Sequence, residues 1–336
     1  MRDRLGAAAD STGTTSETGS GEDSPLPRAA RDTAAMRIGF LGLAHSHPFT
    51  DAGVARSLGV DDIVVWSDEP ERLARFRGDH PCRVVDSPAA LLAARPDVVV
   101  VTMRPAAAPE AVRRVLAAGI PCFGNKLLAV DERGLDTLDA AVAQAPDRFL
   151  TTSVLRFSPA VAELSARVAP GDVLAARAEV AHDIGAFLAP ERAWQDDPAT
   201  GGGTLLSVGL HGIELLDAVL RPQTGFSPVA ALGAARVHDT ASEDVGVLLL
   251  RGPDGLPATV EVVGVGPGER YAVTLHTSSG RAEAVLEGAD PREALGYRGT
   301  MRAVLRMAAG ASSEVDWTRS RAVLHAAIRS ARTARS

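Results

Sequence analysis

The chain has few cysteines and no cluster of basic residues. Its two cysteines, Cys82 and Cys122, stand far apart and form no Cys-x-x-Cys pair. We therefore expect two reduced thiols, and neither a disulfide framework nor a zinc site. The formal net charge is −7, and the arginines are interleaved with acidic residues. This charge pattern predicts that neither nucleic acid nor an anionic membrane surface is a partner.

Long apolar runs and aromatic residues are also scarce. No apolar run approaches the roughly 18 residues that a membrane-spanning helix needs, and no apolar segment follows Arg2 and Arg4. We therefore predict a cytoplasmic protein with no membrane span and no secretory signal. Aromatic residues make up 4% of the chain and hydrophobic residues 46%, with abundant Ala, Val and Leu. This composition indicates α/β layers around an ample core.

The 336 residues suit two domains behind a polar tail. Nine of the ten residues at positions 11–20 are Ser, Thr or Gly. Such a segment cannot bury enough apolar surface to offset the entropy lost on ordering it. We therefore predict that residues 1–35 are disordered, that a first domain covers residues 36–155, and that a second covers residues 156–336.

The first domain alternates short apolar runs with helical segments. Strands are predicted at residues 37–41, 63–66, 84–85, 98–103, 121–123 and 149–155. Helices are predicted at residues 50–58, 89–94, 109–118 and 132–143, with another beginning at Pro70. Because strands that alternate with crossover helices pair in parallel, this half predicts a Rossmann-type doubly wound parallel sheet.

The second domain has a different pattern. A helix at 160–168 and a strand at 173–180 precede a helix that follows the glycines at 201–203. Further strands are predicted at residues 234–238, 245–250, 259–265, 272–276 and 282–286, and helices at 302–309 and 319–331. Glycine- and proline-rich turns separate several of these strands, so we predict a mostly antiparallel sheet with flanking helices.

The loop after the first strand partly matches a dinucleotide fingerprint. That fingerprint, G-x-G-x-x-G, uses glycines for a tight turn, a close approach to a pyrophosphate and helix packing. Gly42 keeps the first position, whereas Ala44 and His47 occupy the other two. With a strand before it and a helix after it, the segment indicates a cofactor loop that includes His45 and Ser46.

Asp68 follows the second predicted strand. A carboxylate there can accept a hydrogen bond from a ribose 2′-hydroxyl, which favours NAD over NADP; the alternative is a turn or N-cap residue. His45 and His47 could also be read as metal ligands of a barrel hydrolase. The antiparallel second half and the scarcity of further suitable histidines argue against that reading, so we predict no metal site.

Residues 201–216 combine three glycines with an apolar helix that carries one polar line. At about 100° per residue, Ser207, His211 and Glu214 fall within roughly 60° of one another on that helix. A histidine at such an edge can exchange a proton with a ligand in a cleft. The alternative is a core histidine bonded to Ser207 or to backbone.

Lys126 ends the fifth predicted strand. Ligands of open α/β sheets bind at the carboxyl ends of the strands. A lysine there can hydrogen-bond a substrate hydroxyl, and burial would lower its pKa. The alternative is a solvated lysine that begins a loop.

Together, these motifs resemble the Gfo/Idh/MocA oxidoreductase family over about residues 36–333. The glycine-triplet helix is the most specific element, and the terminal Ala-Ile-Arg-Ser-Ala-Arg also matches. Matching positions of the helix are Gly201, Gly202, Gly203, Leu205, Gly209 and His211. The resemblance implies an N-terminal dinucleotide-binding domain and a C-terminal domain for substrate binding and oligomerisation, in a homodimer or homotetramer.

The chain departs from the family pattern at several positions. The family usually carries Glu-Lys-Pro where this chain has Asn125, Lys126 and Leu127, and an aspartate where it has Ser207. Glu214 stands where another aspartate is common. The sequence keeps the basic pair Lys126 and His211 but loses two carboxylates.

The resemblance implies an NAD(P)-dependent oxidoreductase, NAD being favoured, that acts on a sugar-like or cyclitol hydroxyl. His211 is expected to act as base, Lys126 to orient the hydroxyl, and Ser207 to align the substrate or His211. The lost carboxylates motivate an alternative, a non-catalytic member that binds a nucleotide or sugar as a sensor or scaffold. A redox-neutral elimination or hydrolysis through a transient ketone is a third reading.

Overall fold

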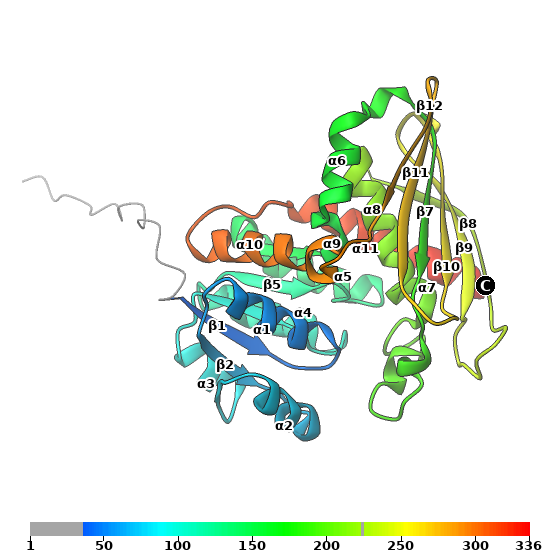
Figure 1. The fold of residues 1–336 in the computed structure, drawn as a ribbon. Coiled ribbons are helices and arrows are strands. Elements are labelled where there is room, and N and C mark those ends of the chain that lie inside the picture. The colour runs from blue at the N-terminus through cyan, green and yellow to red at the C-terminus, as the bar shows by residue number, and fades with distance from the viewer. Residues whose placement is uncertain (1–35, 223–224) are drawn as a thin grey trace, which may run out of the picture.

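The computed structural model describes residues 36–222 and 225–336 (Figure 1). The predicted disorder of residues 1–35 lies outside the described residues. Two six-stranded sheets organise the chain, and helices pack on both faces of the first and on one face of the second (Figure 1).

The first sheet is wholly parallel, in the order β3-β2-β1-β4-β5-β6. Its strands are β1 (Arg37–Leu41), β2 (Asp62–Trp66), β3 (Arg83–Val84), β4 (Val98–Val101), β5 (Cys122–Asn125) and β6 (Phe149–Thr152). Its helices are α1 (His47–Ser57), α2 (Pro70–Asp79), α3 (Pro88–Ala93), α4 (Ala108–Ala117) and α5 (Glu132–Val142). The predicted doubly wound sheet is therefore confirmed, with shorter strands at β4 and β6.

The strand order places β1 beside β4 at the centre of this sheet. The chain runs outward from β1 to β3 on one side and from β4 to β6 on the other, so the winding direction reverses between β1 and β4. Every residue of β4 is buried, as its continuous apolar run predicts. The crevice at the carboxyl ends of these two strands is the usual ligand site of such sheets.

The second sheet has the order β12-β11-β7-β10-β9-β8, in which only β7 and β10 pair in parallel. Its strands are β7 (Val173–Ala181), β8 (Ser227–Ala234), β9 (Val245–Arg251), β10 (Pro257–Val263), β11 (Arg270–Thr277) and β12 (Gly280–Val285). The predicted mostly antiparallel sheet is confirmed.

One predicted strand of this sheet is wrong. Residues 234–238 lie mostly beyond β8, which ends at Ala234. The amide groups of Arg236, Val237 and His238 instead donate to the Asp244 carboxylate. Because these three successive amides donate to one carboxylate, they cannot form the backbone hydrogen bonds of a β-strand.

The helices of the second half are α6 (Pro159–Arg167), α7 (Gly203–Ser207), α8 (Gly209–Leu220), α9 (Pro291–Ala294), α10 (Tyr297–Ala308) and α11 (Trp317–Arg335). Every residue of α8 is buried. By length and hydropathy the stretch Gly203–Leu220 could cross a membrane, contrary to the expectation from the sequence, but it lies wholly inside the protein. Its longer part, α8, packs against β7 and β10 of the second sheet.

The end of the chain returns to the first sheet. Helix α10 packs against α1 and β4, and α11 contacts β6 and α5 as well as α8 and β8. The two halves therefore share a continuous packed boundary near the carboxyl edge of the first sheet (Figure 1). The division at residues 155 and 156 stays a prediction.

Candidate functional site

Lys126 and His211 meet where the two halves join. Lys126 directly follows β5, and His211 lies in the first turn of α8. The Lys126 Nζ atom is 3.0 Å from His211 Nε2 and donates to the Ser207 carbonyl oxygen at 2.9 Å. Three predicted site residues, from segments far apart in sequence, therefore form one polar cluster.

The other ring nitrogen of His211 is also engaged. Its Nδ1 atom lies 2.6 Å from Ser153 Oγ, just beyond β6. Burial, and then the positive charge of Lys126, hold the pKa of His211 well below its usual value. The imidazole is therefore neutral at neutral pH, and Ser153 orients it.

Lys126 is the group in this cluster that titrates near neutrality. Burial lowers the pKa of Lys126 to about 7, with Arg192 acting in the same direction and Glu269 opposing it. A lysine with this pKa exists in both protonation states at neutral pH, as a proton-transfer group needs.

A pocket surrounds the cluster and draws residues from both halves. His45, Ser46 and His47 line it from the β1–α1 loop, together with Lys126, Ser207 and His211. Several of its polar atoms are buried without a partner among the described residues: His45 Nδ1, His47 Nδ1 and Ser207 Oγ. Burial, followed by Lys126, lowers the pKa of His45 to about 3, so this ring is neutral too. These free polar atoms can bind a polar ligand.

Gly42 and Ala44 shape the loop and do not line this pocket. Gly42 has φ +87°, and a Cβ there would stand 2.5 Å from Met103 Sδ, so only glycine fits. The Ala44 amide donates to the Thr102 carbonyl at 3.0 Å. Asp68 is exposed beyond the end of β2 and also lies outside the pocket lining.

The glycine triplet turns the chain sharply into the site. A Cβ on Gly201 would stand 2.1 Å from the Trp194 carbonyl oxygen, and Gly202 and Gly203 have φ of +83° and +69°. The following segment is not one helix: α7 ends at Ser207, and α8 begins at Gly209. This break places the Ser207 carbonyl, rather than its hydroxyl, on Lys126.

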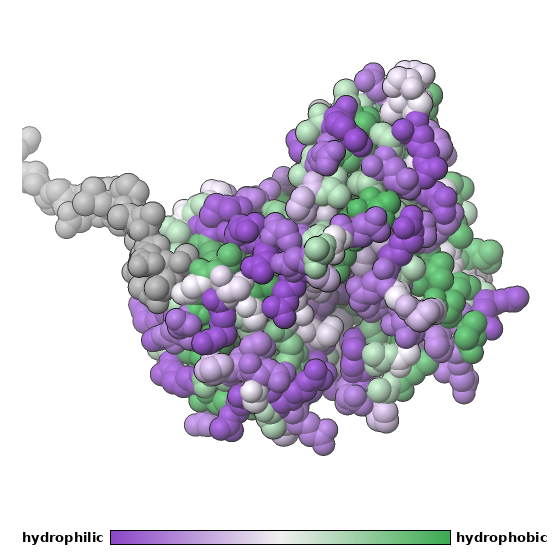
Figure 2. Space-filling view, viewed as in Figure 1, coloured by the Kyte–Doolittle hydropathy of each residue, from purple (hydrophilic) through white to green (hydrophobic). Residues whose placement is uncertain are grey.

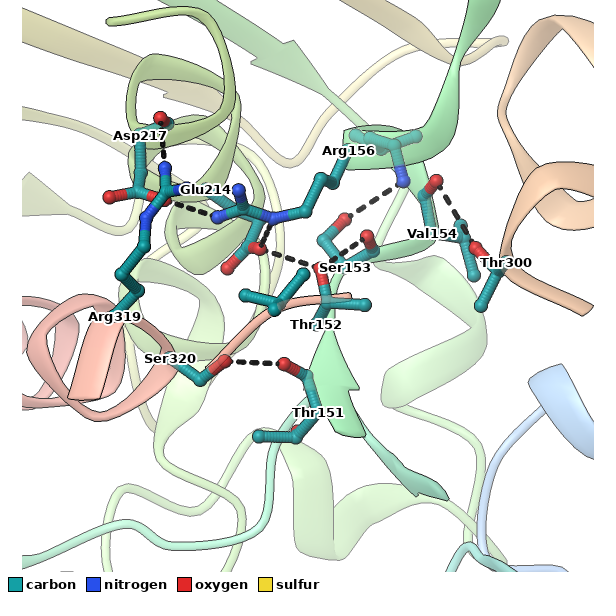
Figure 3. A network of polar contacts seen from close by, with 12 residues as sticks. Thr151, Thr152, Ser153, Val154, Arg156, Glu214, Asp217, Thr300, Arg319 and Ser320 are labelled. Carbon is teal, nitrogen blue, oxygen red and sulfur yellow. Dashed lines mark hydrogen bonds and ion pairs between the residues drawn. The ribbon is translucent and has the colours of Figure 1, made fainter. Parts of the chain in front are cut away.

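Glu214 does not line the pocket that holds Lys126 and His211. The expected polar line of Ser207, His211 and Glu214 therefore does not face a single site. The Glu214 carboxylate accepts from Thr152 Oγ1 at 2.6 Å and is paired with Arg156 (Figure 3). Arg156 also pairs with Asp217, which binds Arg319 at 2.8 Å (Figure 3). Glu214 therefore belongs to a buried ion-pair network that anchors α8.

The second half of the chain contributes pocket residues that no local pattern predicted. His182 Nδ1 lies 3.0 Å from Glu269 Oε1 and 3.2 Å from the Tyr271 hydroxyl. Arg192 and Tyr297 line the same pocket. The sequence could not predict these residues as pocket residues, because they come from separate segments that meet only in the folded chain. Over the described ranges, no group of three or more His, Cys, Asp or Glu side chains could hold a metal ion.

Solved structures with the same architecture include several dehydrogenases. GenD2 from gentamicin A biosynthesis, solved in complex with NAD, matches with a TM-score of 0.78 and 19% identity, over 93% of this chain and 97% of that one. A myo-inositol dehydrogenase from Corynebacterium glutamicum matches with a TM-score of 0.72 and 17% identity, over 89% and 97%. The UDP-N-acetylglucosamine 3-dehydrogenase GnnA from Acidithiobacillus ferrooxidans matches with a TM-score of 0.67 and 20% identity, over 89% and 97%.

No curated protein sequence matches the chain significantly. The family model described as the GFO/IDH/MocA C-terminal domain matches residues 160–283, which include β7 to β11 and the helix that carries His211. In this region the chain is therefore similar to the C-terminal domain of the GFO/IDH/MocA family.

Proposed function

We propose that the protein is an NAD(P)-dependent oxidoreductase that moves a hydride between nicotinamide and a sugar-like or cyclitol hydroxyl. The contact between Lys126 and His211 in a pocket at the carboxyl edge of the parallel sheet carries this proposal. Similar folds in an NAD complex and in inositol and sugar-nucleotide dehydrogenases support it.

The residues of the β1–α1 loop fit a dinucleotide. Gly42 and Ala44 form its turn, and the unpartnered His45 Nδ1 and His47 Nδ1 atoms, with Ser46, face the pocket that such a cofactor would enter. We propose that Asp68 favours NAD over NADP by repelling a 2′-phosphate. A bound nicotinamide supplies the hydride acceptor for alcohol oxidation.

The proton of the substrate hydroxyl is taken by the basic pair. His211 Nε2 and Lys126 Nζ lie 3.0 Å apart, so one substrate oxygen can contact both. His211 accepts the proton while Ser153 holds its ring, and Lys126 orients the oxygen and stabilises negative charge as the carbonyl forms. The Ser207 carbonyl fixes Lys126, and its free hydroxyl aligns the substrate.

Replacing His211 tests this assignment. We expect His211→Ala to lower kcat by roughly 100-fold or more for oxidation of inositols or sugars, with NADH binding retained. Lys126→Ala should raise KM as well as lower kcat. His276→Ala, an exposed histidine on β11, is the matched control and should leave turnover unchanged. A folded His211→Ala protein with full activity would refute the site.

The alternative function is a non-catalytic family member that binds a nucleotide or sugar as a sensor or scaffold. Ser207 stands where the family has an aspartate, and no described ion pair joins a carboxylate to Lys126. Binding of NADH and a polyol without reduction of NAD, over a full panel of inositols and sugars, would favour this alternative.

We also propose that the protein is cytoplasmic and assembles as a homodimer or homotetramer. The outer surface of β8 and β9 supports self-association, because Leu232, Val247 and Leu249 are 71%, 42% and 39% exposed there (Figure 2). Exposed neighbouring apolar residues on a sheet commonly mark a protein interface.

A further inference from the structure

Two arginines that the proposed proton transfer does not use line a second pocket between the halves. Arg72 comes from α2, and Arg192 from the segment just before Ala193–Gln195. Both line this pocket together with Ser46 and Thr50 of the α1 start. Arg192 and Ser46 also line the pocket that holds Lys126 and His211, so the two pockets adjoin.

Arg192 carries a positive charge that no described carboxylate pairs with. Its Nη2 donates to Gln195 Oε1 at 3.1 Å, and its guanidinium lies 4.9 Å from the centre of the Phe187 ring. Its Nε is buried without a hydrogen-bond partner in the described part of the chain. A half-buried guanidinium with a free N–H group is suited to an oxyanion.

Arg72 supplies a second, nearly buried cation beside the cofactor loop. Its side chain is 14% exposed, and it donates to the carbonyl oxygens of Leu43 and His45. Glu69, 3.3 Å from Arg72, also pairs with Arg104 at 3.0 Å. Glu191 also lines the pocket, but the lining holds three arginines, Arg72, Arg75 and Arg192, against this one carboxylate, which leaves positive charge in excess.

Contacts between the halves hold Arg192 over this edge. The Arg104 guanidinium, from the loop after β4, lies 5.6 Å from the centre of the Trp194 ring. Trp194 is two residues beyond Arg192 in the same short segment. This contact ties the Arg192 segment to the carboxyl edge of the first sheet.

We propose that Arg72 and Arg192 form an oxyanion-binding site and that it holds the diphosphate of the nicotinamide cofactor. The assignment of the ligand rests on the proposed function. The loop lacks two fingerprint glycines, and its Ala44 amide is already bonded to Thr102, so its backbone offers less to a pyrophosphate. Two guanidinium groups replace that contribution by bidentate, charge-assisted hydrogen bonds.

Calorimetric titration of the full chain with NADH, ADP-ribose, inorganic pyrophosphate and adenosine tests the site. We expect Arg192→Gln to weaken binding of the three diphosphate ligands at least about ten-fold, the scale of a lost charged hydrogen bond, and to leave adenosine binding unchanged. Arg72→Gln should act in the same direction, with its Tm measured because Arg72 also holds the loop. Arg77→Gln, an exposed change of equal charge on α2, is the control and should bind as the native chain does.

The outcomes separate this site from the proposed reaction. Native-like binding of ADP-ribose and pyrophosphate by Arg192→Gln would overturn the oxyanion site, even if alcohols are oxidised. If diphosphate binding is unaffected while KM rises for glucuronate or glucose 6-phosphate but not for glucose, the oxyanion belongs to the substrate and the diphosphate assignment is wrong. If Arg192-dependent binding of pyrophosphate is found but no alcohol is oxidised, the arginine site stands and the oxidoreductase proposal fails.

Discussion

At the scale of single residues, the proposed chemistry depends on a lysine that titrates near neutrality beside a histidine that is already neutral. Burial lowers the pKa of Lys126 to about 7 and holds that of His211 well below its usual value. His211 is already neutral and serves as the base, whereas Lys126 must be protonated to stabilise the developing negative charge, so kcat/KM for alcohol oxidation should fall as pH rises through the Lys126 pKa of about 7.

The variant Lys126→Met tests whether this pH dependence belongs to Lys126. Without Lys126 no group of this cluster titrates near neutrality, and we expect the fall in kcat/KM around pH 7 to disappear while kcat is lower at every pH. Initial rates with saturating NAD from pH 5 to 9 would measure both effects. An unchanged pH profile in the variant would assign the titration to another group.

Asp51, on α1, is a buried carboxyl group whose titration should make the free energy of unfolding depend on pH. It is 1% exposed and accepts from Asn125 Nδ2 at 3.0 Å. Burial raises the pKa of Asp51 to about 7, although the Asn125 bond opposes the shift. Because the folded-state pKa is raised, the folded chain binds more protons than the unfolded chain between about pH 4 and 7. This contribution to stability is present below that window and is lost as pH rises through 7.

We therefore expect Asp51→Asn to flatten this dependence. Relative to the native chain, the variant should gain more than about 1 kcal/mol of unfolding free energy between pH 5 and pH 8. Urea unfolding at both pH values measures the change. Asp136→Asn, at an exposed position of α5, controls for the loss of one charge. Equal pH dependence in the native and Asp51→Asn proteins would contradict the expected pKa.

At the scale of elements, the Arg156 network joins the short helix Val154–Phe157 to α8 (Figure 3). The Arg156, Glu214 and Asp217 side chains are 8%, 3% and 1% exposed. Removing one partner leaves buried charge uncompensated, so Arg156→Gln should lower the unfolding free energy by about 3–5 kcal/mol. Arg113→Gln, which breaks an exposed pair with Glu110, should leave the unfolding free energy nearly unchanged because solvent screens that pair.

Urea unfolding of both arginine variants at pH 7 measures this difference. Two equally small losses would mean that α8 is held mainly by apolar packing. His211 projects from the same helix, so a destabilised α8 should also raise the mobility of the site.

At the scale of the whole molecule, we propose that the outer face of the second sheet joins subunits. Leu232 on β8 pairs directly with Val247 on β9, and both are exposed. If this face joins subunits, Leu232→Glu with Val247→Lys should shift the protein from a dimer or tetramer to a smaller species by light scattering. Val237→Glu, in an exposed loop position, is the control and should keep the native mass. A native chain that is already monomeric would refute the interface.

The sequence by itself determined the two architectures and the residues at the strand ends. The apolar runs and intervening helices predicted the parallel sheet, and the position of Lys126 after the fifth strand followed from that pattern. The glycine triplet and His211 were recognisable because positive φ angles and close backbone contacts restrict residue choice locally. These features depend on spacing within one segment, which a sequence displays directly.

Only the tertiary structure decided which polar groups meet. Glu214 has the same helical spacing from His211 that a site residue would have, but Arg156, from another segment, draws its carboxylate into an ion pair. Ser153 orients His211 across 58 positions of sequence, and Arg192, from the second half, lines a pocket with residues of α1 and α2. Helical periodicity determines which side of a helix a residue occupies. The partner of a buried polar group, in contrast, depends on which other element packs there, and that is set by the whole fold.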